Sequence, residues 1–157
     1  MYVDNNLVVS GAISAAGAVS VQTVTGTNTS VLSTNTIDLL QARDMGEGND
    51  LLKLRAEVLT AFAGATSVEI QAIVADDAAL SSNVTVIGSS GAIPLASLTL
   101  GARFAVELNP RIGSKGQRYL GARYVIVGAG SAGAVFTDFG SEYQDGQKFY
   151  PNGFAVL

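Results

Sequence analysis

The feature that most constrains the fold is a regular alternation of apolar and polar side chains near the middle of the chain. Between residues 51 and 61, apolar residues alternate with charged ones: Leu52, Leu54, Ala56 and Val58 against Lys53, Arg55 and Glu57. Residues 67–75 repeat the pattern with Val68, Ile70, Ala72 and Val74 on one face. A period of two is typical of a β-strand with one buried face. Because Gly64 lies between the two runs, we expect them to form a hairpin.

A glycine-rich stretch follows an apolar run near the carboxyl end. Residues 128–133 read Gly-Ala-Gly-Ser-Ala-Gly and match G-x-G-x-x-G, a dinucleotide-binding fingerprint. That fingerprint requires a helix after the glycines and an acidic residue about 20 positions further on. Here a β-branched and aromatic run, 134–139, follows and stops at Gly140. We therefore interpret 119–127 as a strand, 128–133 as a turn and 134–139 as an antiparallel partner, and we expect no cofactor.

Further short strands are expected at 36–40, 84–87 and 103–108, and 93–95 is expected to be an edge or crossing segment because it contains Pro94. The chain of 157 residues is the size of one domain. About eight short strands with turns every 8–12 residues indicate an all-β fold, a jelly-roll β-sandwich of antiparallel strands.

The two ends of the chain differ from this body. We divide the chain into an extended N-terminal arm at 1–35, the sandwich at 36–139 and an aromatic C-terminal tail at 140–157. No residue from Asn5 to Thr36 is charged. This arm should form extended segments, and because it is too weakly hydrophobic to pack alone, we expect it to be mobile or to lie on a neighbouring subunit. The tail carries aromatic residues that we interpret as docking anchors: Tyr143, Phe149, Tyr150 and Phe154.

The composition removes most catalytic chemistry. The chain has no cysteine and no histidine, so it has no disulfide, no thiolate metal site and no Ser-His-Asp or Cys-His arrangement. The acids Asp44, Glu47 and Asp50 lack the spacing of a calcium loop, and we interpret them as a solvated turn. We expect no catalytic, cofactor-binding or metal site, and hence no enzyme.

Charge and hydropathy point to an assembly. Hydrophobic residues make up 48% of the chain and charged residues only 14%, which suggests that part of the surface is covered by another protein. The net charge of −4 argues against nucleic acid as a partner. Five of the nine cations form a local cluster that could contact an acidic protein surface or could simply be solvated: Arg103, Arg111, Lys115, Arg118 and Arg123. We expect no signal peptide and no membrane span, and thus a chain made in the cytoplasm.

The order of several segments resembles the jelly-roll capsid cement (decoration) proteins of tailed bacteriophages. The resemblance rests on Met1–Asp4 with Leu7–Ser10, on Thr34–Leu39 with Ala42–Gly48, on Gly88–Leu95 with Gly101–Phe104, and on Arg118–Leu120 leading into 121–127. The segments at 11–33 and 140–157 depart from the family pattern.

The resemblance implies a structural protein on the capsid exterior that binds the major capsid protein, cements its subunits and forms dimers or trimers on local symmetry axes. Candidate contact residues, with the capsid or between copies, are Tyr2, Val3, Leu7, Val8, Arg111, Lys115, Tyr143, Phe149, Tyr150 and Phe154. The alternatives are a carbohydrate- or host-surface-binding jelly-roll module, which the absence of tryptophan disfavours, and a nucleotide-dependent enzyme acting through the glycine motif.

Overall fold

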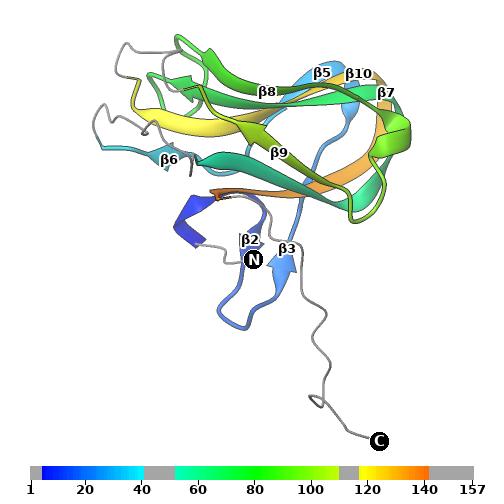
Figure 1. Cartoon of the computed structure of the whole chain (residues 1–157), viewed down its shortest axis with the longest axis horizontal. Helices are drawn as coiled ribbons and strands as arrows, with labels where there is room; N and C mark the ends of the chain where they lie inside the picture. The colour runs from blue at the N-terminus through cyan, green and yellow to red at the C-terminus, as the bar shows by residue number, and fades with distance from the viewer. Residues whose placement is uncertain (1–4, 41–51, 110–116, 142–157) are drawn as a thin grey trace, which may run out of the picture.

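The computed structural model describes residues 5–40, 52–109 and 117–141, and it shows an antiparallel β-sandwich (Figure 1). The described residues contain two short 3-10 turns, η1 (Asn5–Leu7) and η2 (Leu95–Ser97), and no α-helix. Among these residues no helix has the length and apolar character needed to span a membrane. The expected all-β fold is confirmed.

Two long strands run through the whole sandwich: β7 (Lys53–Ala75) and β10 (Tyr119–Gly140). The remaining strands are shorter and lie around them: β1 (Val8–Ser10), β2 (Ala12–Ile13), β3 (Val19–Ser20), β4 (Gln22–Thr23), β5 (Gly26–Leu32), β6 (Ile37–Asp38), β8 (Thr85–Pro94) and β9 (Arg103–Glu107).

The two expected hairpins are wrong. Residues 53–61 and 67–75 belong to one continuous strand, β7, and residues 119–127 and 134–139 belong to another, β10. The two strands pair with each other from Tyr119 opposite Ala75 to Gly140 opposite Lys53. Likewise, residues 85–87 and 93–94 are the two ends of one strand, β8, which lies at the edge of the sheet as expected and ends at Pro94.

The glycines explain the difference, because they form bulges in facing strands and not tight turns. The register of β7 against β10 shifts at four places between Val127 and Val135. Gly64 and Gly128 have positive φ angles of 77° and 90°. A Cβ at Gly64 would overlap the carbonyl oxygen of Ala129, so the two backbones approach too closely for any other residue. Bulges bend and twist a strand pair, and here they turn both strands from one layer into the other.

The layers follow from this bend (Figure 1). In the first layer, β5 and β6 flank residues 119–130 of β10, and β8 flanks residues 67–74 of β7. In the second layer, β1 and β4 flank residues 134–138 of β10, and β9 flanks residues 53–57 of β7. Counting each half of β7 and β10 separately, and counting β5 with β6 and β1 with β4 as one edge each because they follow one another along β10, gives four strand positions in each of the two layers, the arrangement of a jelly roll.

The core lies between the layers and is supplied by both long strands. Leu54 and Val58 from one half of β7 meet Ile70 from the other half, and Tyr124 and Phe139 enter from β10. Burial of each such side chain stabilises the fold by roughly 1.5–3 kcal/mol. The alternation that predicted both halves of β7 therefore also identified their core-facing apolar residues, whereas Arg55, which it placed on the opposite face, is buried too.

The N-terminal segment has the expected extended form, but much of it pairs within its own chain. Strands β1, β4 and β5 lie along β10 and form one edge of the sandwich. The β2–β3 hairpin forms a separate two-stranded sheet. Neither a mobile segment nor a neighbouring subunit is needed to account for residues 8–10, 22–23 and 26–32.

The bend predicts a position-specific sensitivity to alanine. Gly64→Ala should destabilise the protein by about 3 kcal/mol or more, since it adds a backbone overlap to the left-handed φ penalty of about 1–2 kcal/mol. Gly91→Ala is the matched control, because Gly91 has a φ of 66° and open space around its Cβ position. The stability lost in Gly91→Ala should be the φ penalty alone. Urea titration measures both, and equal losses would contradict the role of Gly64 in the bend.

Candidate interaction surface

The β2–β3 hairpin projects from the second layer of the sandwich (Figure 1). Its strands pair only with each other among the described residues, with Ala12 opposite Ser20 and Ile13 opposite Val19. No residue from 12 to 21 is buried, and Val19 and Val21 are 53% and 42% exposed. The hairpin is therefore an uncharged, partly apolar element presented to the surroundings.

The turn of the hairpin is closed by Ser14. The Ser14 N–H donates to the Ala18 carbonyl oxygen at 2.8 Å, and the Gly17 N–H donates to the Ser14 carbonyl oxygen at 2.9 Å. The Ala18 N–H donates to Ser14 Oγ at 3.0 Å. Gly17 takes a positive φ of 80°, which glycine adopts without strain. These bonds give the sequence Ser-Ala-Ala-Gly a defined turn.

The base of the hairpin is fixed against β10. Gly11 has a φ of 87°, and a Cβ there would overlap the Ser20 carbonyl oxygen and touch the Phe136 ring. The Asn35 side-chain amide donates to the carbonyl oxygens of Val8 and Gly11 at 3.3 and 3.2 Å. A two-stranded hairpin alone is marginally stable, so these contacts hold its direction.

A buried hydroxyl cluster ties the strand before the hairpin to the core. Ser10 Oγ lies 2.6 Å from the Tyr124 hydroxyl, which donates to Thr137 Oγ1 at 2.7 Å. All three residues are fully buried. Burial raises the pKa of Tyr124 to about 12, while its hydrogen bonds with Ser10 and Thr137 partly oppose that rise. The cluster joins β1 to both halves of β10.

On the other side of the hairpin, Gln22 connects the chain to the end of β5. Its Nε2 donates to the Leu32 carbonyl oxygen at 2.6 Å, and its Oε1 accepts from the Thr34 N–H at 3.0 Å. With the hydroxyl cluster, this contact fixes the chain on both sides of the projecting element.

The cations of the described residues are held by partners within the chain: Lys53 by Glu107, Arg55 by Asp138, Arg103 by Glu57, Arg118 by Asp38 and Arg123 by Gln71. The hydrogen bond from Arg118 lowers the pKa of Asp38 below its usual value. Three members of the predicted cationic cluster, Arg103, Arg118 and Arg123, are thus engaged internally.

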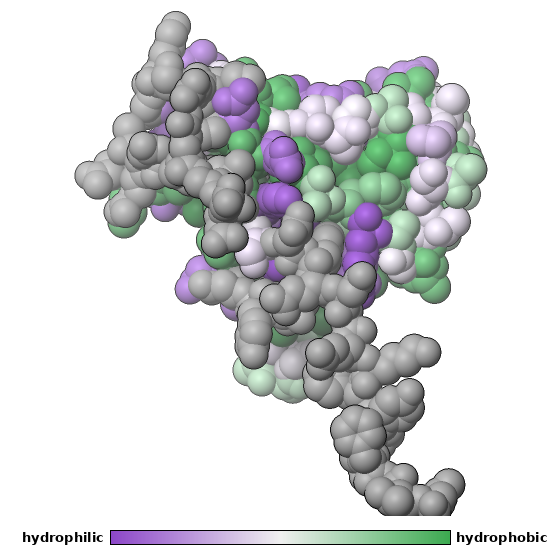
Figure 2. Space-filling view, in the orientation of Figure 1, coloured by the Kyte–Doolittle hydropathy of each residue, from purple (hydrophilic) through white to green (hydrophobic). Residues whose placement is uncertain are grey.

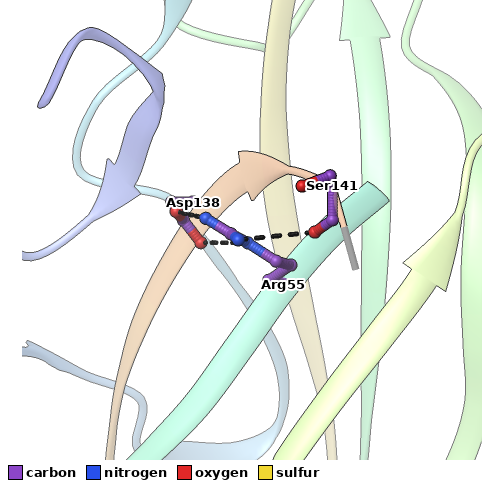
Figure 3. Close-up of polar contacts among 3 residues, drawn as sticks. All are labelled: Arg55, Asp138 and Ser141. Atoms are coloured by element: carbon purple, nitrogen blue, oxygen red, sulfur yellow. Dashed lines mark hydrogen bonds and ion pairs between the residues drawn. The ribbon is translucent and has the colours of Figure 1, made fainter. Parts of the chain in front are cut away.

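The Arg55–Asp138 pair differs from the others because it is buried (Figure 3). The two residues are opposite each other in the β7–β10 ladder, and their side chains are 3% and 2% exposed. Arg55 Nε donates to Asp138 Oδ1 at 3.1 Å, and the pair is completed by Nη2 and Oδ2. The guanidinium also donates to the Ser141 carbonyl oxygen at 3.4 Å and lies over Gly140, where a Cβ would overlap it. This pair fastens the end of β10 to the start of β7.

Two of the predicted contact residues lie in the described part of the chain. Leu7 is half-buried and packs on the core, and Val8 is 4% exposed and lies opposite Asp138. Both side chains support the fold. The other predicted contact residues lie outside the described residues: Tyr2, Val3, Arg111, Lys115, Tyr143, Phe149, Tyr150 and Phe154.

Sequence reasoning missed Val19 and Val21 as surface residues. The available signal was the Ser-Ala-Ala-Gly turn between short apolar runs, which is typical of a hairpin. The glycine motif at 128–133 is part of β10, and strand continues from Ser131 to Gly140 where the fingerprint needs a helix. Among the described residues no acidic group has the geometry of a metal site, and Asp44, Glu47 and Asp50 lie outside them.

Comparison with known protein families gives a match. A family model described as Bbp16 matches residues 13–138, which is most of the chain and includes β3 and both long strands. No curated protein matches the chain significantly.

The hydroxyl cluster predicts a loss of stability at high pH. The pKa of Tyr124 in the folded protein is raised above its ordinary value of 10.0. The contribution of Tyr124 to the free energy of unfolding is therefore complete below pH 10 and is lost as the pH rises towards 12. The loss should be on the order of 2–3 kcal/mol. Tyr124→Phe should lower stability at neutral pH by about 1–3 kcal/mol and flatten the decline above pH 10. Urea titrations from pH 8 to 12 measure both, and an unchanged slope in the variant would contradict the assignment.

The buried ion pair predicts a large effect of removing its carboxylate. Asp138→Leu should destabilise the protein by about 3–5 kcal/mol, because the Arg55 guanidinium stays buried without its anion. The double variant Arg55→Met with Asp138→Leu should recover most of that loss. Asp38→Leu at the exposed Arg118 pair is the control and should change stability little. A double variant less stable than Asp138→Leu would count against this account of the pair.

Proposed function

The chain belongs to the Bbp16 family, and we propose that it is a structural virion protein that binds the outside of a phage capsid and cements major capsid protein subunits together. The proposal starts from the resemblance to jelly-roll cement proteins and includes assembly in the host cytoplasm. It also includes a dimer or trimer on local symmetry axes. The protein acts through contacts, without catalysis.

The observation that carries the proposal is the projecting β2–β3 hairpin. It is exposed, contains no charged residue and is fixed at its base by Gly11 and Asn35. The cores of protein–protein interfaces are depleted in charge, and exposed strand edges pair with strands of other chains. A rigid element of this kind loses little conformational entropy on binding.

Pairing of the described charges supports the same function. The described lysines and arginines already contact acidic or amide groups of the chain. Binding through the β2–β3 hairpin therefore depends on buried area and backbone pairing. We therefore expect capsid binding to change little with salt, unlike a contact made by opposite charges.

The test uses heads of the parent phage assembled without this protein. Wild-type protein should sediment with the heads and raise the temperature at which they fall apart. Val19→Asp should weaken binding by at least about tenfold, because the interface would bury an unpaired carboxylate. Val19→Thr has nearly the same shape and is the control, with a smaller expected loss. Wild-type protein that never sediments with heads would refute the function.

A further inference from the structure

We propose that the bend of the sandwich is a second contact surface for the shell, so that one molecule bridges two capsid subunits. This inference rests on the proposed capsid-binding function and adds the second surface to it. The corner end, as we name this surface, is the exposed side of four segments, residues 24–30, 58–68, 95–102 and 124–134, whose other side chains belong to the core.

The four segments meet in space where β7 and β10 curve from one layer into the other, at the right of Figure 1. The Val24 N–H donates to the Gly133 carbonyl oxygen at 2.9 Å, and the Gly128 N–H donates to Asn28 Oδ1 at 2.9 Å. The Phe62 N–H donates to the Leu98 carbonyl oxygen at 3.1 Å. The corner end is therefore one surface made from four parts of the sequence.

No residue of the corner end is charged. The charged side chains of β7, β9 and β10 lie outside it, and those of Glu57, Glu69, Arg103 and Arg123 border its segments. Two of the large exposed aliphatic side chains lie on it, Leu100 at 69% and Val127 at 48% exposure. The right-hand end of the face in Figure 2 is accordingly mostly apolar or weakly polar. Such depletion of charge is typical of an interface core.

The corner end is also preorganised. Gly64 lies against the backbone of Ala129, and Gly133 lies so close to the Phe62 ring that a Cβ would overlap it. The turn at Leu100 is tied to β7 because the Gly101 N–H donates to the Val58 carbonyl oxygen at 2.8 Å. A surface fixed in this way binds without the entropic cost of ordering loops.

The size of the surface favours a subunit of the shell over a second copy of this chain. Four strands about 4.8 Å apart in layers about 10 Å apart present an end of roughly 400 Å² once side chains are included. A stable dimer buries about 800 Å² on each partner. A corner-to-corner dimer would be too small to persist, whereas the shell already holds the molecule by the hairpin. A second weak contact then adds affinity through its high effective concentration.

The directions of the two surfaces indicate bridging. The hairpin projects from the second layer, and the corner end lies at the end of both layers (Figure 1). The two surfaces therefore face different ways and contact different parts of the shell. The occupant of the corner end is an uncharged, apolar patch of a shell subunit other than the one that holds the hairpin.

The test compares two leucines with the same exposure at opposite ends of the molecule. Leu100 and Leu40 are both 69% exposed, and Leu40 lies next to β6, away from the bend. Leu40 has a positive φ of 63°, a conformation that aspartate adopts more readily than most residues, so aspartate is tolerated there. Leu100→Asp and Leu40→Asp should both melt like the wild type. Leu40→Asp should bind heads normally, and Leu100→Asp should need at least about tenfold more protein to saturate them.

The bridging role has its own readout. At saturating protein, Leu100→Asp should occupy the heads through the hairpin but raise their disassembly temperature less than Leu40→Asp does. If the two variants bind and stabilise heads equally, the second surface is refuted while the proposed function stands. If wild-type protein does not bind heads, the proposed function fails first. If Leu100→Asp instead turns a wild-type dimer into a monomer in sedimentation equilibrium, the occupant is a second copy and the inference is overturned.

Discussion

The pairing of β7 with β10 from one end of the sandwich to the other is the constraint on which the rest of the structure depends. The two strands supply the middle of both layers, so the layers are joined through the backbone and not only through side chains. Every other strand of the main sheet is placed by its register against one of the two. The bend near Gly64 and Gly128 sets where the core closes, and the Arg55–Asp138 pair fixes the far end of the ladder.

The sequence was sufficient for the apolar face of β7, because period-two alternation depends only on which side of a strand meets the core. Leu54, Val58 and Ile70 are buried as that pattern predicts, whereas Arg55 on the opposite face is buried as well, because it pairs with Asp138. The connections between strand segments were harder to predict from the sequence, since a glycine indicates a tight turn and a bulge equally well. The apolar residues on both sides of Gly64 stand at even positions, which is the parity that one continuous strand keeps.

The candidate interaction surface was predictable only in part. The absence of charge from residue 5 to 36 pointed to contact with protein, and the structure adds the direction of the hairpin and its anchors at Gly11, Ser10 and Asn35. Those anchors depend on Tyr124 and Phe136, which are distant in sequence, so no local pattern could reveal them. The ion pairs that occupy Arg103 and Arg118 are likewise set by strand register.

The order of pairing along the chain has a consequence for biosynthesis. Strands β1, β4, β5 and β6 all use β10 as their ladder partner, and Ser10 and Tyr124 are 114 residues apart in sequence. While the ribosome makes the intervening segments, the backbone groups of these early strands have no ladder partner, because β10 has not yet been synthesised. Folding that depends on such distant contacts is slow and leaves the nascent chain exposed to wrong partners. Because the emerging chain also carries little charge, we expect it to need protection by molecular chaperones during synthesis.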